Sequence, residues 1–153
     1  MTPAVFSNNR YVDDQGAEHG GQCQIFTPAV ALNYGDAVYF SAANTVTKST
    51  TPGDYVAFAG FVVGGDLTFN AALLTRPATG TVQVASANGS VLVQIDGVVY
   101  LINAATPAAG SRVIGDTVTA GRVAAGVTAG QILATLIEVG VAGDLTRAII
   151  RHR

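Results

Sequence analysis

The sequence predicts an all-β protein, a small β-barrel or sandwich built of antiparallel hairpins. Short apolar runs rich in Val, Ile, Tyr, Phe and Thr recur at intervals of about 8 to 12 residues. Asn-Gly, Asp-Gly and Gly-Asp pairs, which favour tight turns, separate these runs. A chain of 153 residues is long enough for one domain with a substantial core.

The clearest pattern lies between Thr81 and Asn103, where three apolar runs are separated by two turn signals. The turns are Asn88-Gly89 and Asp96-Gly97, and both pairs tolerate the positive φ values of hairpin turns. We therefore expect a three-stranded antiparallel meander here. It would join two similar halves, at about residues 28–80 and 98–153, within a single domain 28–153.

The first half contains strands separated by glycine-containing or asparagine-containing turns. Gly35-Asp36 precedes the apolar run 37–40, and Ala43-Asn44 turns the chain into the run 45–47. A Pro-Gly turn at 50–54 leads to strands at 55–59 and 61–63, which we expect to be interrupted at Gly60. The segment 67–74 closes this half.

The second half repeats several of these signals. Gly110 has a sequence context similar to that of Gly35, 75 positions earlier, and Gly65-Asp66-Leu67-Thr68 returns as Gly143-Asp144-Leu145-Thr146. Either an internal duplication or a shared set of turn residues explains this. The run 129–139 fits both a helical stripe and a buried strand, and we favour a strand for most of it, or one helical turn at its start.

Residues 1–27 form a polar segment without sustained periodicity, and we expect an extended N-terminal arm. Its large apolar residues argue against a fully disordered tail, so it would lie on a partner or fold back on its own domain. The expected partner-binding residues of this arm are Phe6, Arg10, Tyr11 and Phe26.

The composition favours a protein that buries much of its surface against neighbours. Charged residues make up only 12% of the chain, against a usual value of about 25%. The net charge is −2 and no basic cluster occurs, so we expect no nucleic-acid partner. No apolar stretch is long enough for a membrane span, and no signal peptide is recognisable, which predicts synthesis in a cytoplasm.

No set of residues in the sequence supports catalysis, a cofactor or a metal site. Glu18, His19 and Cys23 are close together, but the following Gly-Gly gives them no rigid frame for zinc. The other histidine, His152, lies near the end of the chain, and Cys23 has no well-placed base. We therefore expect no catalytic, cofactor-binding or metal-binding residues.

The aspartates occur beside glycines, which is typical of turns rather than of paired catalytic carboxylates. We expect their carboxylates to accept hydrogen bonds from nearby backbone amides. The residues concerned are Asp36, Asp54, Asp66, Asp96, Asp116 and Asp144.

The segment from Ile114 to Glu138 is similar to the strand-turn pattern of biotinyl and lipoyl carrier domains. Those domains need a lysine at a hairpin tip for attachment of the swinging arm. Lys48 is the only lysine in this chain, so the resemblance implies a small β-barrel with Gly-Asp turns and no cofactor.

The order of motifs resembles that of the head decoration (cement) proteins of tailed bacteriophages. The matching runs extend over about 120 residues: Gly35–Phe40, Thr45–Thr47, Ala59–Val62, Asp96–Tyr100, Ala108–Val113, Ile137–Gly140, Ala142–Leu145 and Ala148–Arg151. The polar arm departs from the Pro-rich arm of the smallest members of this group.

This resemblance implies a non-enzymatic virion protein on the capsid exterior. Its partner would be the major capsid protein, whose neighbouring subunits it would cross-brace, and it would be a homo-oligomer, with a trimer favoured. The alternatives are a head-spike or tail component, and a small-ligand-binding or carrier-type β-barrel.

Overall fold

A computed structural model describes residues 6–7, 10–11, 22–51, 57–67 and 81–150, and it confirms the all-β class. No α-helix occurs in these described segments. The strands are β1 (Phe6–Ser7), β2 (Arg10–Tyr11), β3 (Cys23–Pro28), β4 (Leu32–Asn33), β5 (Ala37–Ala42), β6 (Thr45–Thr47), β7 (Phe58–Gly65), β8 (Gln83–Ala85), β9 (Val91–Gln94), β10 (Val98–Ile102), β11 (Arg112–Gly115), β12 (Val123–Ala125), β13 (Ala134–Leu136) and β14 (Leu145–Ile150).

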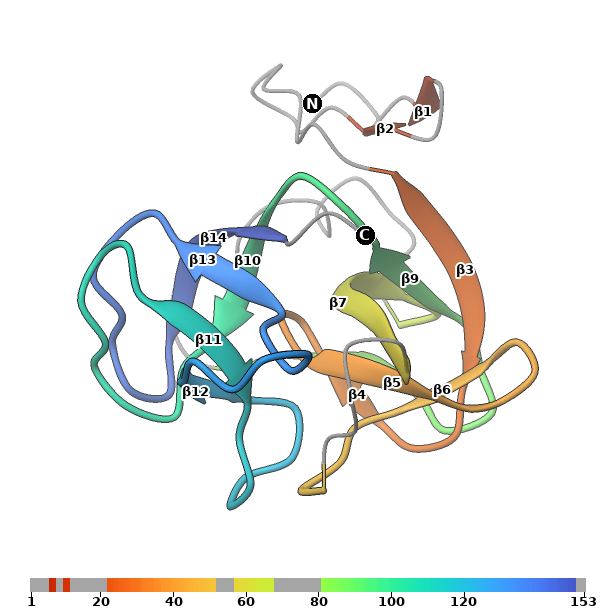
Figure 1. Ribbon diagram of the computed structural model, residues 1–153. Coiled ribbons are helices and arrows are strands. Elements are labelled where there is room, and N and C mark those ends of the chain that lie inside the picture. Colours follow the sequence, from red (N-terminus) through yellow and green to blue (C-terminus); the bar gives the residue numbers. More distant parts are fainter. Residues whose placement is uncertain (1–5, 8–9, 12–21, 52–56, 68–80, 151–153) are drawn as a thin grey trace.

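The first unit is a closed five-stranded barrel in the order β3-β6-β5-β7-β9, with β9 pairing back to β3 (Figure 1). Its neighbouring strands are antiparallel except β3 and β6, which close the barrel in parallel. The short pair β4–β8 accompanies it. The barrel interior is filled by fully buried valines, namely Val38, Val46, Val62 and Val93.

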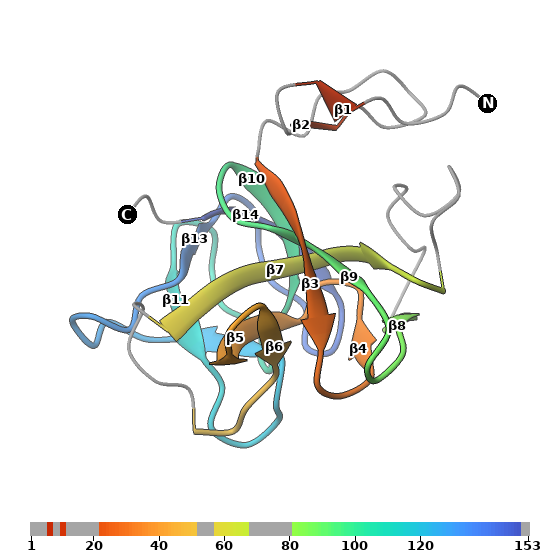
Figure 2. The same ribbon diagram turned by 90° about the vertical axis from the view of Figure 1, so that its right-hand side faces the viewer.

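The second unit is a five-stranded sheet in the order β10-β14-β13-β11-β12. All its pairs are antiparallel. A parallel bridge between Asn103, directly after β10, and Val123 in β12 brings its two outer strands together. The two units lie side by side in Figure 1, with β3 on the side of the first unit that faces away from the second, and Figure 2 shows the first unit in front.

The two units have the same topology. In chain order, β3, β5, β6, β7 and β9 correspond to β10, β11, β12, β13 and β14, and the corresponding strands have the same neighbours and directions. The register agrees as well. A row of paired residues crosses each unit, Ala37–Phe61–Gln94–Cys23 in the first and Arg112–Thr135–Ile149–Val98 in the second.

Equivalent backbone hydrogen bonds extend this correspondence to the turns. The amide of Gly35 donates to Val62 O at 2.8 Å, and that of Gly110 donates to Leu136 O at 2.9 Å. Gly35 and Gly110 have φ values of 86° and 83°. The parallel closures match too, since the amide of Ala29 donates to Val46 O and that of Ala104 donates to Val123 O.

The correspondence corrects part of the expected repeat. Gly35 and Gly110 are equivalent, 75 residues apart, as the sequence indicated. The repeated tetrapeptide is not equivalent, because Asp66 follows β7 whereas Asp144 precedes β14. The register of β14 instead aligns Gly143 with Asn88, and both have positive φ (75° and 62°).

The expected three-stranded meander is wrong. Its three segments are strands, but β8 pairs with β4, β9 with β3 and β7, and β10 with β14. Gly97, with a φ of 81°, turns the chain from the first unit into the second rather than into a hairpin. A turn signal reports where a chain changes direction, and it does not report which strands pair.

Other sequence expectations are confirmed only in part within the described residues. The strands at 37–40 and 45–47 are β5 and β6, and Asn44 between them has a φ of 58°. In the ambiguous run 129–139 only Ala134–Leu136 is a strand (β13), so the strand is shorter than expected, and the run contains no helix. Gly60 does not interrupt its strand as expected, because β7 runs through it with a φ of 150° and with a bulge in its pairing to β5.

Several expectations fall partly or wholly outside the described residues. Most of the Pro-Gly turn at 50–54, the start of the strand at 55–59 and most of the segment 67–74 are among them. Of the expected arm, β1 and β2 form an antiparallel pair, and residues 23–27 belong to the barrel strand β3. The arm as a partner-binding element stays a prediction.

Candidate interaction surfaces

The contact between the two units is built around a glycine of the first unit. An added Cβ at Gly35 would lie 2.7 Å from Leu145 Cδ2 and 3.1 Å from Ile102 Cγ1, both in the second unit. The amide of Ala37 donates to Gly121 O at 2.8 Å across the same contact. The positive φ and the missing Cβ of glycine therefore allow the backbone before β5 to approach β10 and β14.

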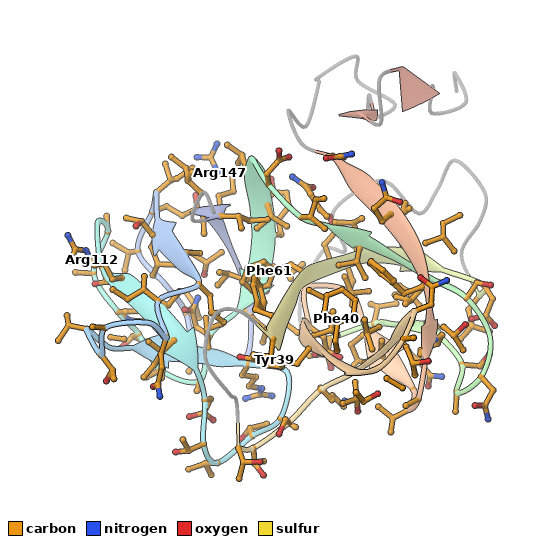
Figure 3. All side chains as sticks on the ribbon, turned by 45° about the vertical axis from the view of Figure 1, so that its right-hand side comes forward. Tyr39, Phe40, Phe61, Arg112 and Arg147 are labelled. Atoms are coloured by element: carbon orange, nitrogen blue, oxygen red, sulfur yellow. The ribbon has the colours of Figure 1, made fainter. Side chains whose placement is uncertain are left out.

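Aromatic residues of the first unit extend this contact. Phe61 precedes the interior residue Val62 in β7, so its side chain lies on the outer face of the barrel, yet it is fully buried. Its ring lies 5.1 Å from that of Phe58, which in turn lies 5.6 Å from that of Tyr39, and both pairs have edge-to-face geometry. Figure 3 places Phe61 between the two units, so the outer face of β7 is covered by the second unit.

Asp36 is the buried carboxylate at this contact. Its Oδ2 accepts a 2.7 Å hydrogen bond from the Asn33 amide and lies 3.7 Å from Lys48 Nζ. Burial raises the pKa of Asp36 above its ordinary value, and the Asn33 hydrogen bond and the charges of Lys48 and Arg122 offset this only in part. The folded protein therefore favours the protonated form of Asp36 relative to the unfolded chain.

We expect Asp36→Asn to gain stability relative to the wild type as the pH rises. The wild-type carboxylate must ionise at a buried site, so its contribution to stability falls as the pH rises from about 3.8 through the higher pKa of the folded state. Urea unfolding of both proteins at about pH 3 and about pH 6 measures this difference. A difference that moves the other way would mean that Lys48 and Arg122 outweigh burial.

Of the other described aspartates, Asp116 and Asp144 accept hydrogen bonds from nearby backbone amides, as the sequence predicted, whereas Asp66 and Asp96 accept them from amides that are distant in the sequence. Asp66 accepts hydrogen bonds from the backbone of Ser86 and Ser90 and from the Ser86 hydroxyl, which lower the pKa of its carboxyl. Asp116 accepts from the Thr119 amide and Asp144 from the Leu145 amide, each at 2.7 Å. Asp96 accepts from the Gln22 amide at 2.6 Å. Asp54 lies outside the described residues.

The described residues contain no group of three or more His, Cys, Asp or Glu side chains that could hold a metal ion. Cys23 is buried, and burial together with the charge of Asp96 raises the pKa of its thiol to about 12. A thiol held in its neutral form is a poor nucleophile and a poor metal ligand. Glu18, His19 and His152 lie outside the described residues.

The predicted partner-binding residues separate into two locations. Phe26 is in β3 of the barrel, where its half-buried ring packs edge-to-face on Phe40 at 5.3 Å. Phe6 pairs with Tyr11 across β1–β2, and Arg10 lies beside Tyr11 in β2.

Sequence reasoning missed the exposed apolar residues on the outside of the two units. Ile25 in β3 is 58% exposed, and Val98 and Ile149, which pair across β10–β14, are 38% and 48% exposed. Ile137, directly after β13, is also exposed. The available signal was a strand with apolar residues on both faces. Because the barrel interior can bury only one face of a strand, the apolar residues on the other face must be exposed or covered by a neighbour.

The carrier-domain alternative finds no attachment point in the described structure. Lys48 follows β6 and faces Asp36. Glu138, at the position that resembled the attachment region, accepts hydrogen bonds from the amide and the guanidinium of Arg147.

In the part of the chain that the structure describes, no helix is long and apolar enough to cross a membrane.

Comparison with known proteins gives a likeness of fold alone. No family model matches the sequence, and no curated protein matches it. Among solved structures, the chain is similar to the head fiber gp8.5 N base of bacteriophage phi29, with a TM-score of 0.50 and 10% sequence identity. The match covers 84% of this chain and 92% of that one, so it includes both units.

Proposed function

We propose that this protein is a non-enzymatic structural component of a phage virion, bound to the exterior of the head. The observation that carries the proposal is the likeness, over most of both chains, to a phage head fiber base. The sequence resemblance to head decoration proteins leads to the same class by a different route. In its finer form, the proposal is that the chain binds the major capsid protein and cross-braces neighbouring subunits.

The described surface is compatible with this role. Capsid binding needs broad contact surfaces of low charge, because charged groups are costly to desolvate. Exposed apolar residues lie on both units, and the charged fraction of the chain is small. As an oligomer, for which the family resemblance favours a trimer, several weak contacts would add up to firm attachment.

A second candidate is the base of a head fiber, since that is how the solved structure is described. It differs from a decoration protein in copy number, because cross-bracing requires a subunit at every repeated capsid position. A fiber is needed only at selected positions.

The test is quantitative mass spectrometry of purified virions and empty heads from the culture that produces this chain. The proposal expects the chain in both particles, and a copy number comparable to that of the major capsid protein identifies cross-bracing. A few copies per particle would favour the fiber base. Recovery only in the soluble lysate would overturn the proposal and favour the ligand-binding barrel.

A further inference from the structure

The contact between the two units joins different faces. The first unit contributes the segment before β5 and the outer row of β5 and β7, including Gly35, Ala37 and Phe61. The second unit contributes Ile102 and Leu145 from β10 and β14, together with the turn at Gly121. When the two units are aligned by their strand register, Ile102 of the second unit corresponds to Thr27 of the first, and Gly121 corresponds to Asn44. The arrangement is therefore head-to-tail, without two-fold symmetry.

Each unit has both kinds of face, and the head-to-tail contact uses one face of the first unit and the other kind of face of the second. One face of each kind is therefore left without a partner within the chain. The face that the first unit buries is exposed in the second: Gly110, Arg112 and Thr135 are exposed, whereas their equivalents Gly35, Ala37 and Phe61 are buried. A Cβ added at Gly110 would meet no atom within 4 Å. Figure 3 shows Arg112 on the side of the second unit that faces away from the first.

The complementary face is exposed on the first unit. Thr27 and Asn44 are exposed, whereas their equivalents Ile102 and Gly121 are buried. Ile25, equivalent to the half-buried Tyr100, is 58% exposed. The two unused faces lie on opposite sides of the molecule, because β3 is at the outer side of the first unit (Figure 1) and Arg112 is at the outer side of the second (Figure 3).

We propose that the second unit of one copy packs its Gly110–Arg112 and Thr135 face against the Ile25, Thr27 and Asn44 face of the first unit of the next copy. The contact repeats, between chains, the one that joins the two units within a chain. A heterologous contact of this kind closes into a ring when its rotation allows. The occupant of both exposed faces is thus a second copy of this protein.

This inference deepens the oligomer part of the proposed function, but its test is independent of capsid binding. The full-length chain and two variants, Ile25→Glu and Thr135→Glu, are compared by sedimentation velocity at the same concentration. Each variant blocks one of the two faces with an exposed charge. An unchanged far-UV circular dichroism spectrum and a cooperative thermal transition establish that each variant is folded, since loss of self-association by itself lowers the transition temperature. Val118→Glu, at a loop position 82% exposed, is the matched control.

The wild type and Val118→Glu are expected to sediment as oligomers and each single-face variant as a monomer. An equimolar mixture of Ile25→Glu and Thr135→Glu should give a dimer and no larger species, because one intact face of each kind remains. A monomeric wild type, an oligomeric single-face variant, or a mixture that stays monomeric would overturn the inference. Capsid binding by a monomeric wild type would leave the proposed function intact.

Discussion

Replacing Phe61 with alanine is expected to lower the free energy of unfolding by about 3–5 kcal/mol, the range for large-to-small substitutions of a buried aromatic. Phe61 is fully buried between the two units, and its ring packs edge-to-face on Phe58. Its removal leaves a cavity in the contact that holds the units together. Urea denaturation followed by circular dichroism measures the loss.

Phe40→Ala is the matched control for this substitution. Phe40 lies in the adjacent barrel strand and also makes one edge-to-face contact, with Phe26, but it is 41% exposed. Because much of its ring is already in water, we expect a loss of only about 1 kcal/mol. Equal losses for both variants would contradict the assignment of Phe61 to the buried contact between the units.

The sequence contained the signal for this burial, but the partner of the buried face was not predictable. All eight residues of β7 are buried, and the strand reads as a continuous apolar run, which is typical of a strand covered on both faces. In β14, exposed and buried residues alternate over the last five positions, because only one face is covered. The outer face of β7 is turned toward the second unit, where β7 contacts β10 without pairing with it. No local pattern specifies a contact between strands that do not pair.

The positions of turns were the feature most predictable from the sequence, and the pairing of strands was the least predictable. Asn44, Asn88 and Gly97 all have the positive φ values that their turn motifs indicated. At Asp96-Gly97, however, the chain enters a new unit, and the Gln94 side chain donates hydrogen bonds to the carbonyls of Asp96 and Val98 there. A tight turn between two β-rich runs is therefore compatible with a hairpin or with a crossing between sheets, and long-range packing decides between them.

The correspondence between the two units was visible in the sequence only at Gly35 and Gly110, because few other side chains match. The equivalent row residues Phe61 and Thr135, or Gln94 and Ile149, differ in chemistry since one unit has that row buried and the other has it exposed. Interior positions match better, as in Val38 with Val113 and Val46 with Val123, all of them fully buried. Similar interiors preserve the barrel, while different exteriors reflect different neighbours.

Gly35→Ala is expected to cost about 1–3 kcal/mol more than Gly110→Ala. Both residues occupy the left-handed region, with φ values of 86° and 83°, so a Cβ at either position brings a backbone penalty of about 1–2 kcal/mol. Only at Gly35 would the added Cβ also collide with Leu145 and Ile102, which adds about 1–3 kcal/mol of overpacking. Chemical denaturation of the two variants under identical conditions measures the difference.

The pair separates two explanations for a glycine at this position. If the left-handed backbone alone required glycine, the two variants would lose equal stability, and the close approach of the units would have no energetic weight. A larger loss at Gly35 means instead that the packing of one unit on the next depends on the missing side chain. Gly110 keeps the same conformation with open space around it, and the proposed second copy would fill that space. In that case Gly110→Ala would cost the isolated chain only the backbone penalty, and it would also weaken self-association.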